Sequence, residues 1–449
     1  MSGHRPRQSG PRPTPDGPIL VDGVIFQLVQ NTGIARVWRS HFEEWLKSGF
    51  ASRVLLLDRG GAGPRLPGLP TRSIPPWEPD ATAEDSLLLQ RVCDEEGAPL
   101  FASTYYTTPI GTPSLMLVYD FIPERLGLDM SEPIWDEKRL AVEHASFYAC
   151  ISENTRRDML ELEPASRGKP SAVIALGVAD ALRPAADGEV EGFRREHRID
   201  RPYFLLVGDR RGVGGYKNTE LLFRALRGWS ELSGHEVVCV GGQPYIEPEL
   251  RLAGPKVRAR RLSLPDEELR LAYAGAVALI YPSRYEGFGL PVAEAMACGC
   301  PVITTKLASL PEVAGDAALY VDPDDPHSIR EALDAVRDPG RRATMVAAGA
   351  VQASAFRWDR ASATFATALS QAASADNAER RARETTWKAR REAQAVRQRE
   401  RRGGRPPHAI PPLGRRTRVR FELWLKSAAL RYLPPRAVVL MRSLRKVVD

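Results

Sequence analysis

The amino-acid sequence predicts an α/β protein made of two units of similar size, each with a parallel β-sheet. Short apolar runs alternate with helix-forming segments along residues 19–183 and again along residues 184–355. Strands that alternate with helices in this way favour parallel sheets with both faces covered. The length of 449 residues leaves room for two or three domains. Ligands of such folds bind at the carboxyl ends of the strands, so we expect them in the cleft between the two units.

The first unit, residues 19–183, follows a Pro- and Gly-rich segment, residues 1–18, that we predict to be disordered. We expect a paired strand element over residues 19–29 and a long surface loop over residues 59–80. The other predicted strands are 53–57, 100–103, 115–119, 147–151 and 172–176, and the predicted helices are 31–47, 83–96, 132–144 and 156–162.

The second unit, residues 184–355, repeats this alternation. Its predicted strands are 203–207, 236–240, 257–260, 276–280, 301–305 and 318–321. Its predicted helices begin after Asn218, at Pro265 and at Pro291, and continue with 328–336 and 341–353.

The stretch 281–305 is the most informative part of the chain. It contains a strand end, a loop with two glycines, and a helix that Pro291 opens, so unpaired backbone N–H groups are offered to an anion. Glu286 lies in the loop, and Glu294 lies in the first turn of the helix. Both carboxylates could accept hydrogen bonds from the hydroxyl groups of a polyol. The alternative is that Glu294 simply stabilises the helix dipole.

The loop 208–218 has the composition of an anion-binding segment. It holds four glycines, the pair Arg210 and Arg211, and Lys217 just before a helix. Glycine lets backbone N–H groups close on an anion, and Arg and Lys supply the charge that neutralises a diphosphate. The alternative is a flexible surface turn with solvated charges. The loop is not a Walker A motif, because its glycine spacing differs and Asn218 follows the lysine.

Several classes of site lack support in the sequence. The seven histidines show no ligand-like pairing, and Asp322-Pro-Asp324 is interpreted as a turn before a helix, so we expect no metal site. There is no Gly-x-Ser-x-Gly elbow of serine hydrolases and no Gly-x-Gly-x-x-Gly fingerprint after the first strand. The five cysteines form no C-x-x-C pair, and we expect them to be reduced and buried.

No apolar run reaches the roughly 18 residues of a membrane-spanning helix, and the N-terminus has no apolar core of a signal peptide. We therefore expect a cytoplasmic protein, with peripheral attachment to the inner face of the membrane as one option. Residues 376–449 hold 21 of the 63 Lys and Arg residues and only 7 of the 56 Asp and Glu residues, so this tail has a net charge of +14 and the remainder −7.

The basic tail also contains apolar residues, which suits the surface of an anionic membrane. Its mixed helical stretches are 378–402, 419–433 and 438–447. The alternatives are a solvated, partly disordered tail and a helix between subunits. No nucleic-acid-binding module is present, and we expect no nucleic-acid partner.

Taken together, the motifs resemble a known family. Residues 285–294 (YEGFGLPVAE), followed by AMACGCPVI and by LPEV at 310–313, are similar to the retaining GT-B glycosyltransferases of family 4. The resemblance extends to Arg211 and Lys217 and to NTGIAR, VYDFIPE and ISENTR in the first unit, and it covers about residues 19–372. It implies two Rossmann-like domains that face each other across a cleft, with a helix over residues 356–372 that crosses back onto the first domain.

The resemblance also implies roles for individual residues. Arg211 and Lys217 would neutralise the donor diphosphate, with Arg210 as the alternative to Arg211. Glu286 would lie beside the transferred sugar, and Glu294 would bind the ribose hydroxyl groups. The other donor-binding residues that the resemblance implies are Gly33, Gly241, Leu264, Gly287, Phe288, Gly289 and Leu290. Neither a metal nor a cofactor is implied.

The pair Tyr119 and Asp120, predicted on the acceptor side, departs from the family pattern, in which many members have His before Asp. Tyr119 can donate a hydrogen bond but cannot do the acid–base work of imidazole near pH 7. In the front-face mechanism proposed for the family, the leaving phosphate itself takes the acceptor proton. Catalysis would then rest on positioning and on stabilising the departing diphosphate.

The sequence therefore predicts a retaining, metal-independent hexosyltransferase. We expect a nucleotide-diphosphate sugar as donor, mannose as the first guess for the sugar, and a saccharide or lipid-linked acceptor in cell-surface polysaccharide or glycolipid synthesis. One alternative is a catalytically silent nucleotide-sugar-binding subunit that recruits partners through its tail. Another is a phosphorylase or epimerase of the same fold.

Overall fold

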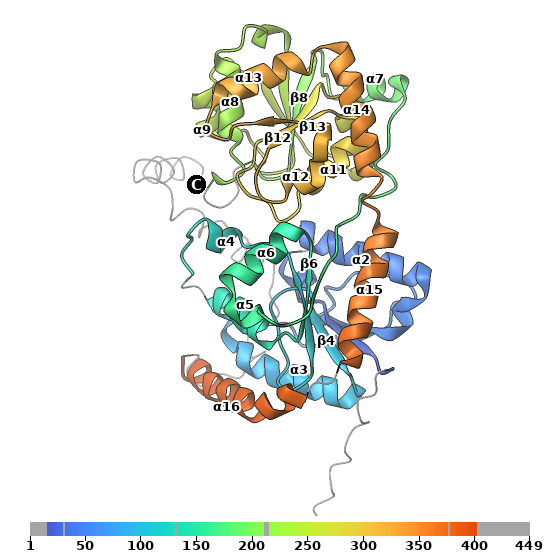
Figure 1. Ribbon diagram of the computed structural model, residues 1–449, viewed down its shortest axis with the longest axis vertical. Coiled ribbons are helices and arrows are strands. Elements are labelled where there is room, and N and C mark those ends of the chain that lie inside the picture. Colours follow the sequence, from blue (N-terminus) through green and yellow to red (C-terminus); the bar gives the residue numbers. More distant parts are fainter. Residues whose placement is uncertain (1–15, 30–31, 131–132, 211–214, 376–377, 402–449) are drawn as a thin grey trace, which may run out of the picture.

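The computed structural model describes residues 16–29, 32–130, 133–210, 215–375 and 378–401. Two α/β domains lie one above the other in Figure 1, and the chain returns from the second domain to the first near its end. Each domain has one sheet, and within both sheets neighbouring strands pair in parallel. The predicted α/β fold with two parallel sheets is thus confirmed.

The first domain has a seven-stranded sheet in the order β3-β2-β1-β4-β5-β6-β7. The chain leaves β1 in one direction and later returns to pair β4 on its other side, so the strand order reverses between β1 and β4. The strands are β1 Ile19–Asp22, β2 Val54–Arg59, β3 Thr71–Ile74, β4 Leu100–Ser103, β5 Ser114–Val118, β6 Phe147–Cys150 and β7 Ser171–Val173. The helices are α1 Val24–Leu28, α2 Gly33–Ser48, α3 Thr82–Glu96, α4 Ile122–Arg125, α5 Pro133–His144 and α6 Glu153–Leu162.

The second domain has a six-stranded sheet in the order β10-β9-β8-β11-β12-β13, which reverses between β8 and β11. Its strands are β8 Tyr203–Val207, β9 Glu236–Val240, β10 Ala259–Leu262, β11 Ala278–Tyr281, β12 Val302–Thr305 and β13 Ala318–Val321. Its helices are α7 Asp187–Glu196, α8 Thr219–Arg227, α9 Pro248–Ala253, α10 Asp266–Ala274, α11 Leu290–Ala297, α12 Leu310–Ala314, α13 Pro326–Ala335 and α14 Pro339–Ala353.

Helix α15 (Trp358–Ser374) leaves the second domain and lies along the first, against α2 (Figure 1). The ring of Phe365 is 5.5 Å from the rings of both Trp38 and Trp45. His41 is completely buried in this contact, and its Nδ1 is 2.9 Å from Ser362 Oγ. Burial lowers the pKa of His41 to about 3, so the imidazole is neutral where the crossover helix packs.

The last described element, α16 (Ala378–Arg401), packs against α3 of the first domain (Figure 1). The predicted helix in the basic tail is therefore present, and it is docked on the protein rather than solvated on all sides. The other two tail stretches, 419–433 and 438–447, lie outside the described residues, as does most of the predicted disordered segment 1–18.

Some sequence predictions about elements were wrong or missing. Residues 24–28 form helix α1 rather than a strand, because Thr104 Oγ1 accepts a hydrogen bond of 2.9 Å from the Ile25 N–H at the helix start. A short apolar run cannot by itself distinguish a helix from a strand. The predicted loop 59–80 contains the edge strand β3, three of whose four side chains are exposed or half-buried. Helices α4, α7, α9 and α12 were not predicted.

All five cysteines are free and buried, as expected. Asp322 Oδ1 accepts a hydrogen bond of 2.8 Å from the Asp324 N–H in the turn before α13. Within the described ranges, no group of three or more His, Cys, Asp and Glu side chains is placed to hold a metal ion. Nor does any helix among the described residues have the length and apolar character needed to cross a bilayer.

Candidate active site

The candidate site lies at the carboxyl ends of β8 and β11, where the order of the second sheet reverses. Ligands of open parallel sheets bind at such a reversal, because the two loops diverge there and leave a crevice. The loop after β8 carries Lys217, and the loop after β11 carries Glu286. A small pocket opens between them, lined by Leu206, Val207, Asp209, Arg210, Lys217, Thr219, Ile280, Tyr281, Pro282 and Ser283.

Lys217 is the central cation of this pocket. Its Nζ lies 2.7 Å from Glu286 Oε1 and 2.9 Å from the Tyr281 hydroxyl oxygen. The ammonium also lies 4.9 Å from the ring centre of Tyr216 and 5.0 Å from that of Tyr281. Burial by itself lowers the pKa of Lys217, but the Glu286 carboxylate outweighs it and the pKa is raised. The side chain is therefore a permanent positive charge, held in place before any ligand arrives.

Glu294, on α11, is buried between the two domains. Its Oε1 is 3.2 Å from Arg36 Nη1 of α2, and its Oε2 accepts a hydrogen bond of 2.9 Å from the Tyr273 hydroxyl. Arg36 also pairs with Asp266 at the start of α10. Burial raises the pKa of Glu294, while Arg36 and the Tyr273 hydrogen bond act in the opposite direction. The carboxylate is thus oriented from both sides of the cleft.

Gly33 lies across the cleft from this carboxylate. It is the first residue of α2, where Thr32 Oγ1 caps the helix by accepting from the Ala35 N–H at 3.4 Å. A Cβ built on Gly33 would meet no atom within 4 Å, so the backbone there faces open space. Because Arg36 reaches Glu294 from one turn further along, the N-terminus of α2 faces α11. Unpaired N–H groups at this helix start suit an anion.

The glycine loop before α11 is pressed against the first domain. A Cβ on Gly287 would lie 2.1 Å from the Tyr119 carbonyl oxygen, so only glycine fits. The Gly287 carbonyl oxygen accepts hydrogen bonds from Ser152 Oγ at 2.7 Å and from Thr155 Oγ1 at 3.1 Å. Gly289 has a φ of 104° and precedes the first residue of α11. This loop therefore joins the donor half of the site to helix α6.

A second carboxylate completes this contact between the domains. Glu312 of α12 accepts hydrogen bonds from the backbone N–H groups of Glu153 at 2.8 Å and Asn154 at 2.7 Å. These N–H groups open helix α6, so the acidic side chain also suits the helix dipole. The Tyr285 hydroxyl donates to Asp158 of the same helix. Part of the motif 285–294 and the motif 310–313 thus fixes how the domains meet.

Tyr119 and Asp120 differ in burial and in the hydrogen bonds that their side chains form. The Tyr119 hydroxyl is buried, accepts from Trp38 Nε1 at 2.5 Å and donates to the Thr104 carbonyl at 3.3 Å. Its one proton is already used inside the first domain. Asp120 is only partly buried, and burial raises the pKa of its carboxyl, while the Lys138 ammonium acts in the opposite direction. Asp120 Cβ lies 3.1 Å from the position that a Cβ on Gly287 would occupy, so this side chain borders the glycine loop before α11.

The Arg210 side chain forms an ion pair and hydrogen bonds within the second domain. Its side chain is 1% exposed, and its Nε is 2.7 Å from Glu247 Oε2. Its two Nη atoms donate to backbone carbonyl oxygens of the loop after β9, those of Gly241, Gln243 and Tyr245, at 2.8, 2.9 and 2.7 Å. Arg210 thus fixes the loop that holds Gly241, one of the predicted donor-binding residues. Arg211 lies outside the described residues.

Comparison with known proteins agrees with this architecture. Residues 201–338 match the family model described as glycosyl transferases group 1. The solved structure of WaaG, a glycosyltransferase involved in lipopolysaccharide biosynthesis, aligns with 78% of this chain and 99% of its own, with a TM-score of 0.62 and 14% identity. The chain thus shares the GT-B fold of this enzyme, and its second domain is similar in sequence to the group 1 glycosyl transferases. The resemblance inferred from the motifs is confirmed.

Two further proteins are similar to this chain. The O-antigen chain mannosyltransferase B of Escherichia coli is 47% identical over 97 residues, which are 21% of this chain and 26% of that protein. The chain thus matches only about a quarter of that relative's length. The HepE protein of Anabaena, solved in complex with UDP and glucose, aligns with 79% of this chain and 100% of its own, with a TM-score of 0.61 and 16% identity.

The predicted donor residues of this chain fall into two groups. Lys217, Glu286, Gly287 and Glu294 surround the ends of β8 and β11, with Gly33 opposite. The remaining side chains pack in the core: Phe288 lies 5.5 Å from the ring of Phe356, and Leu264 and Leu290 are partly buried against the main cluster.

Sequence reasoning missed Arg36, Tyr273 and Tyr281 as partners of the two glutamates. Arg36 belongs to the motif NTGIAR, but its partner is 258 positions away. Tyr281 directly follows the predicted strand 276–280, and its position shortly before the glycine loop was the one signal that pointed to it. Tyr273 lies on an ordinary amphipathic helix, and no local pattern marks it.

Proposed function

We propose that this chain is a retaining, metal-independent glycosyltransferase that moves a hexose from a nucleotide-diphosphate sugar to a saccharide or lipid-linked acceptor. The product would belong to a cell-surface polysaccharide or glycolipid. One observation carries the proposal: a buried lysine ammonium is fixed at the reversal of the second sheet, 2.7 Å from Glu286, opposite an open helix N-terminus. That arrangement suits a diphosphate that must leave with its negative charge.

In the proposed reaction, the bond between the sugar's anomeric carbon and the diphosphate oxygen breaks. Lys217 and the N–H groups at the starts of α2 and α11 stabilise the departing diphosphate. The acceptor oxygen bonds to the same face of the anomeric carbon, and its proton passes to the leaving phosphate oxygen. Glu286 accepts hydrogen bonds from the sugar, and Glu294 accepts them from the ribose. Neither a metal nor a cofactor takes part in these steps.

The choice of donor rests on the relatives. The E. coli relative is a mannosyltransferase, which makes mannose the first sugar to test. The Anabaena protein was solved with UDP and glucose, which makes UDP-glucose the second donor to test. The site itself distinguishes poorly between hexoses, because Lys217, Glu286 and Glu294 recognise groups that all such donors share.

We further propose that the protein works on the cytoplasmic side of a membrane and attaches to anionic lipid through its basic tail. Residues 402–449 contain basic and apolar residues in succession. Full-length protein should pellet with anionic vesicles and not with neutral ones, whereas a chain ending at Arg401 should stay in solution. Equal, negligible pelleting of both chains would contradict the attachment.

A donor panel tests the proposed activity. GDP-mannose, UDP-glucose, UDP-galactose and UDP-N-acetylglucosamine are incubated with the protein and EDTA, with octyl α-mannoside as an acceptor probe, and free nucleotide is measured. Consumption of at least one donor is expected. Binding of a donor without any consumption would favour a silent binding subunit. Consumption that requires orthophosphate and yields a sugar phosphate would favour a phosphorylase.

A further inference from the structure

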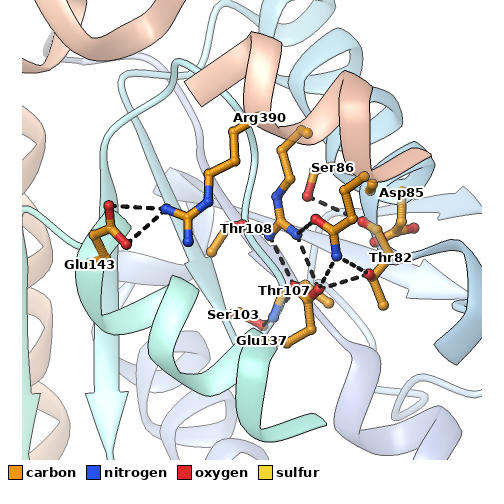
Figure 2. A network of polar contacts seen from close by, with 12 residues as sticks. Thr82, Asp85, Ser86, Ser103, Thr107, Thr108, Glu137, Glu143 and Arg390 are labelled. Atoms are coloured by element: carbon orange, nitrogen blue, oxygen red, sulfur yellow. Dashed lines mark hydrogen bonds and ion pairs between the residues drawn. The ribbon is translucent and has the colours of Figure 1, made fainter. Parts of the chain in front are cut away.

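Helix α16 returns to the first domain and inserts one arginine into it. Arg391 is completely buried, and its guanidinium forms a two-point ion pair with Glu137 of α5: Nη1–Oε1 is 3.1 Å and Nη2–Oε2 is 2.9 Å. The same Nη2 donates to Thr108 Oγ1 at 2.8 Å. Figure 2 shows Thr108 and Glu137 converging beneath the helix. A two-point pair of this kind fixes direction as well as distance.

The neighbouring contacts of α16 extend this network. Gln394 Nε2 donates to Glu137 Oε1 at 3.2 Å, and Gln398 Nε2 donates to Thr82 Oγ1 at 2.9 Å. Thr82 in turn donates to Glu137 at 2.7 Å (Figure 2). The polar side chains at 391, 394 and 398 lie on one face of the helix, as their spacing requires. The polar side chains on this face of α16 therefore each find a hydrogen-bond partner in the first domain.

One partner of Arg391, Glu137, is followed in the chain by a lysine that contacts the segment of Asp120, on the predicted acceptor side. Glu137 precedes Lys138, which is 1% exposed and whose Nζ lies 3.2 Å from the Asp120 carbonyl oxygen and 2.7 Å from Glu124 Oε1. Helix α5 thus contacts Arg391 through Glu137 and the segment of Asp120 through Lys138.

The second partner, Thr108, belongs to the loop that follows β4, at the point where the first sheet reverses. Tyr105 and Tyr106 of this loop are stacked, with ring centres 4.0 Å apart. Burial, followed by the nearby Asp120 carboxylate, raises the pKa of Tyr105. Tyr106 also packs against the buried cluster that contains Phe121, the residue after Asp120, so the aromatic pair borders the segment of Asp120. Aromatic faces beside a carboxylate suit a sugar ring, which has apolar C–H faces and hydroxyl edges.

We propose that α16 is a positioning element for the acceptor site: Arg391 fixes α5 through Glu137 and the loop 104–112 through Thr108. These two segments then hold Lys138 and the tyrosine pair around Asp120, where a pyranose ring of the acceptor binds. The inference rests on the proposed function, because it assigns the acceptor to the first domain. It adds that the acceptor site depends on a helix from the far end of the described chain.

The test compares Arg391→Gln with Arg390→Gln. Arg390 is the neighbouring arginine on the same helix, and it pairs with Glu143 at the exposed surface, 3.0 Å away (Figure 2). Backbone hydrogen exchange is measured over residues 104–112 and 133–144. Exchange there should be faster by roughly tenfold in Arg391→Gln, because a buried charged hydrogen bond is lost. Arg390→Gln should match the wild type. Unchanged exchange in Arg391→Gln would overturn the proposal, whatever the activity.

Kinetics supplies the second arm, with octyl α-mannoside as the acceptor probe and the donor selected by the panel. In Arg391→Gln the KM for the acceptor should rise roughly tenfold or more, as expected for a displaced binding site, while the KM for the donor stays unchanged. A merely destabilised protein would lower kcat and leave both KM values unchanged, which would contradict the positioning role.

Thr108→Val provides a milder variant if Arg391→Gln does not fold. It removes one hydrogen bond and keeps the ion pair with Glu137, so a smaller rise in the acceptor KM is expected. No rise would overturn the role of the loop. A wild type that consumes no donor would instead refute the proposed function, and the exchange experiment would still decide whether α16 fixes the two segments.

Discussion

The Lys217 ammonium lies 2.7 Å from the Glu286 carboxylate, although the two residues belong to loops that follow different strands. The strands β8 and β11 are neighbours only because the order of the sheet reverses between them. The Glu286 carboxylate raises the pKa of the buried lysine and so keeps it charged. The Tyr281 hydroxyl oxygen accepts a hydrogen bond from the ammonium and orients it. The cation is therefore organised before the donor binds, which is the condition for efficient stabilisation of a leaving group.

Lys217→Ala should lower transfer by about 10²-fold or more, because the departing diphosphate loses its fixed countercharge. The rate is measured with the best donor of the panel. Lys256→Ala, which removes an exposed lysine of the same domain, is the control and should keep the wild-type rate. Activity of Lys217→Ala within about threefold of the wild type would refute the role of Lys217.

Glu294→Gln should raise the KM for the donor by about tenfold, since a neutral amide accepts weaker hydrogen bonds from the ribose than a carboxylate does. Tyr273→Phe, which removes only the 2.9 Å hydrogen bond that orients Oε2, should have a smaller effect of the same kind. Titration of the bare nucleoside diphosphate provides the direct measurement. A larger effect for Tyr273→Phe than for Glu294→Gln would mean that Glu294 only supports the fold.

Gly287→Ala should block the approach of the two domains. Its Cβ would lie 2.1 Å from the Tyr119 carbonyl oxygen, and a backbone atom cannot move aside as a side chain would. Nucleotide binding to the second domain should persist, whereas transfer should fall by roughly 10²-fold because the acceptor no longer reaches the sugar. Gly188→Ala, at a helical position with open space around it, is the control. Equal transfer by both variants would contradict the proposed closed arrangement.

Acid should loosen the crossover helix α15 through His41. Burial lowers the pKa of this imidazole to about 3 from an unfolded value near 6.5, so the folded state binds the proton more weakly. The stabilising contribution is complete above pH 6.5 and is lost as the pH falls toward 3, by about 2 kcal/mol at pH 5. Urea unfolding at pH 7.5 and pH 5 measures it.

His41→Gln cannot titrate, so its unfolding free energy should change less between these two pH values than that of the wild type. His327→Gln, which replaces an exposed histidine, should behave like the wild type. The same pH dependence in His41→Gln would assign the acid sensitivity to other groups.

The sequence was sufficient to predict the fold and the loops and helix that carry Lys217, Glu286 and Glu294. Alternating apolar runs and glycine stops predicted most strands and helices, and the glutamates at 286 and 294 lie on the loop and helix that were expected. The four central strands of the second sheet, β9, β8, β11 and β12, could be predicted because they are buried, and buried strands are continuous apolar runs. The edge strand β3 was not predicted, because three of its four side chains are exposed or half-buried and follow no apolar pattern.

The contacts between segments that are distant in the sequence could not be predicted from it. Arg36 and Glu294 are 258 positions apart, and Arg391 and Glu137 are 254 apart. The composition of the tail suggested solvated or lipid-facing charge, whereas the fold buries one of its arginines completely. Tyr119 likewise looked available to a substrate, but the Trp38 indole lies 2.5 Å from its hydroxyl oxygen. Such pairings depend on tertiary packing, which no local pattern encodes.

The most direct test of the central claim is the anomeric configuration of the product. The wild-type protein is incubated with the best α-linked donor and an acceptor in the presence of EDTA, and the coupling of the new anomeric proton is followed by NMR. The proposed reaction predicts an α-linked product formed at an undiminished rate without free divalent metal. A β-linked product, or a reaction that stops in EDTA, would contradict it.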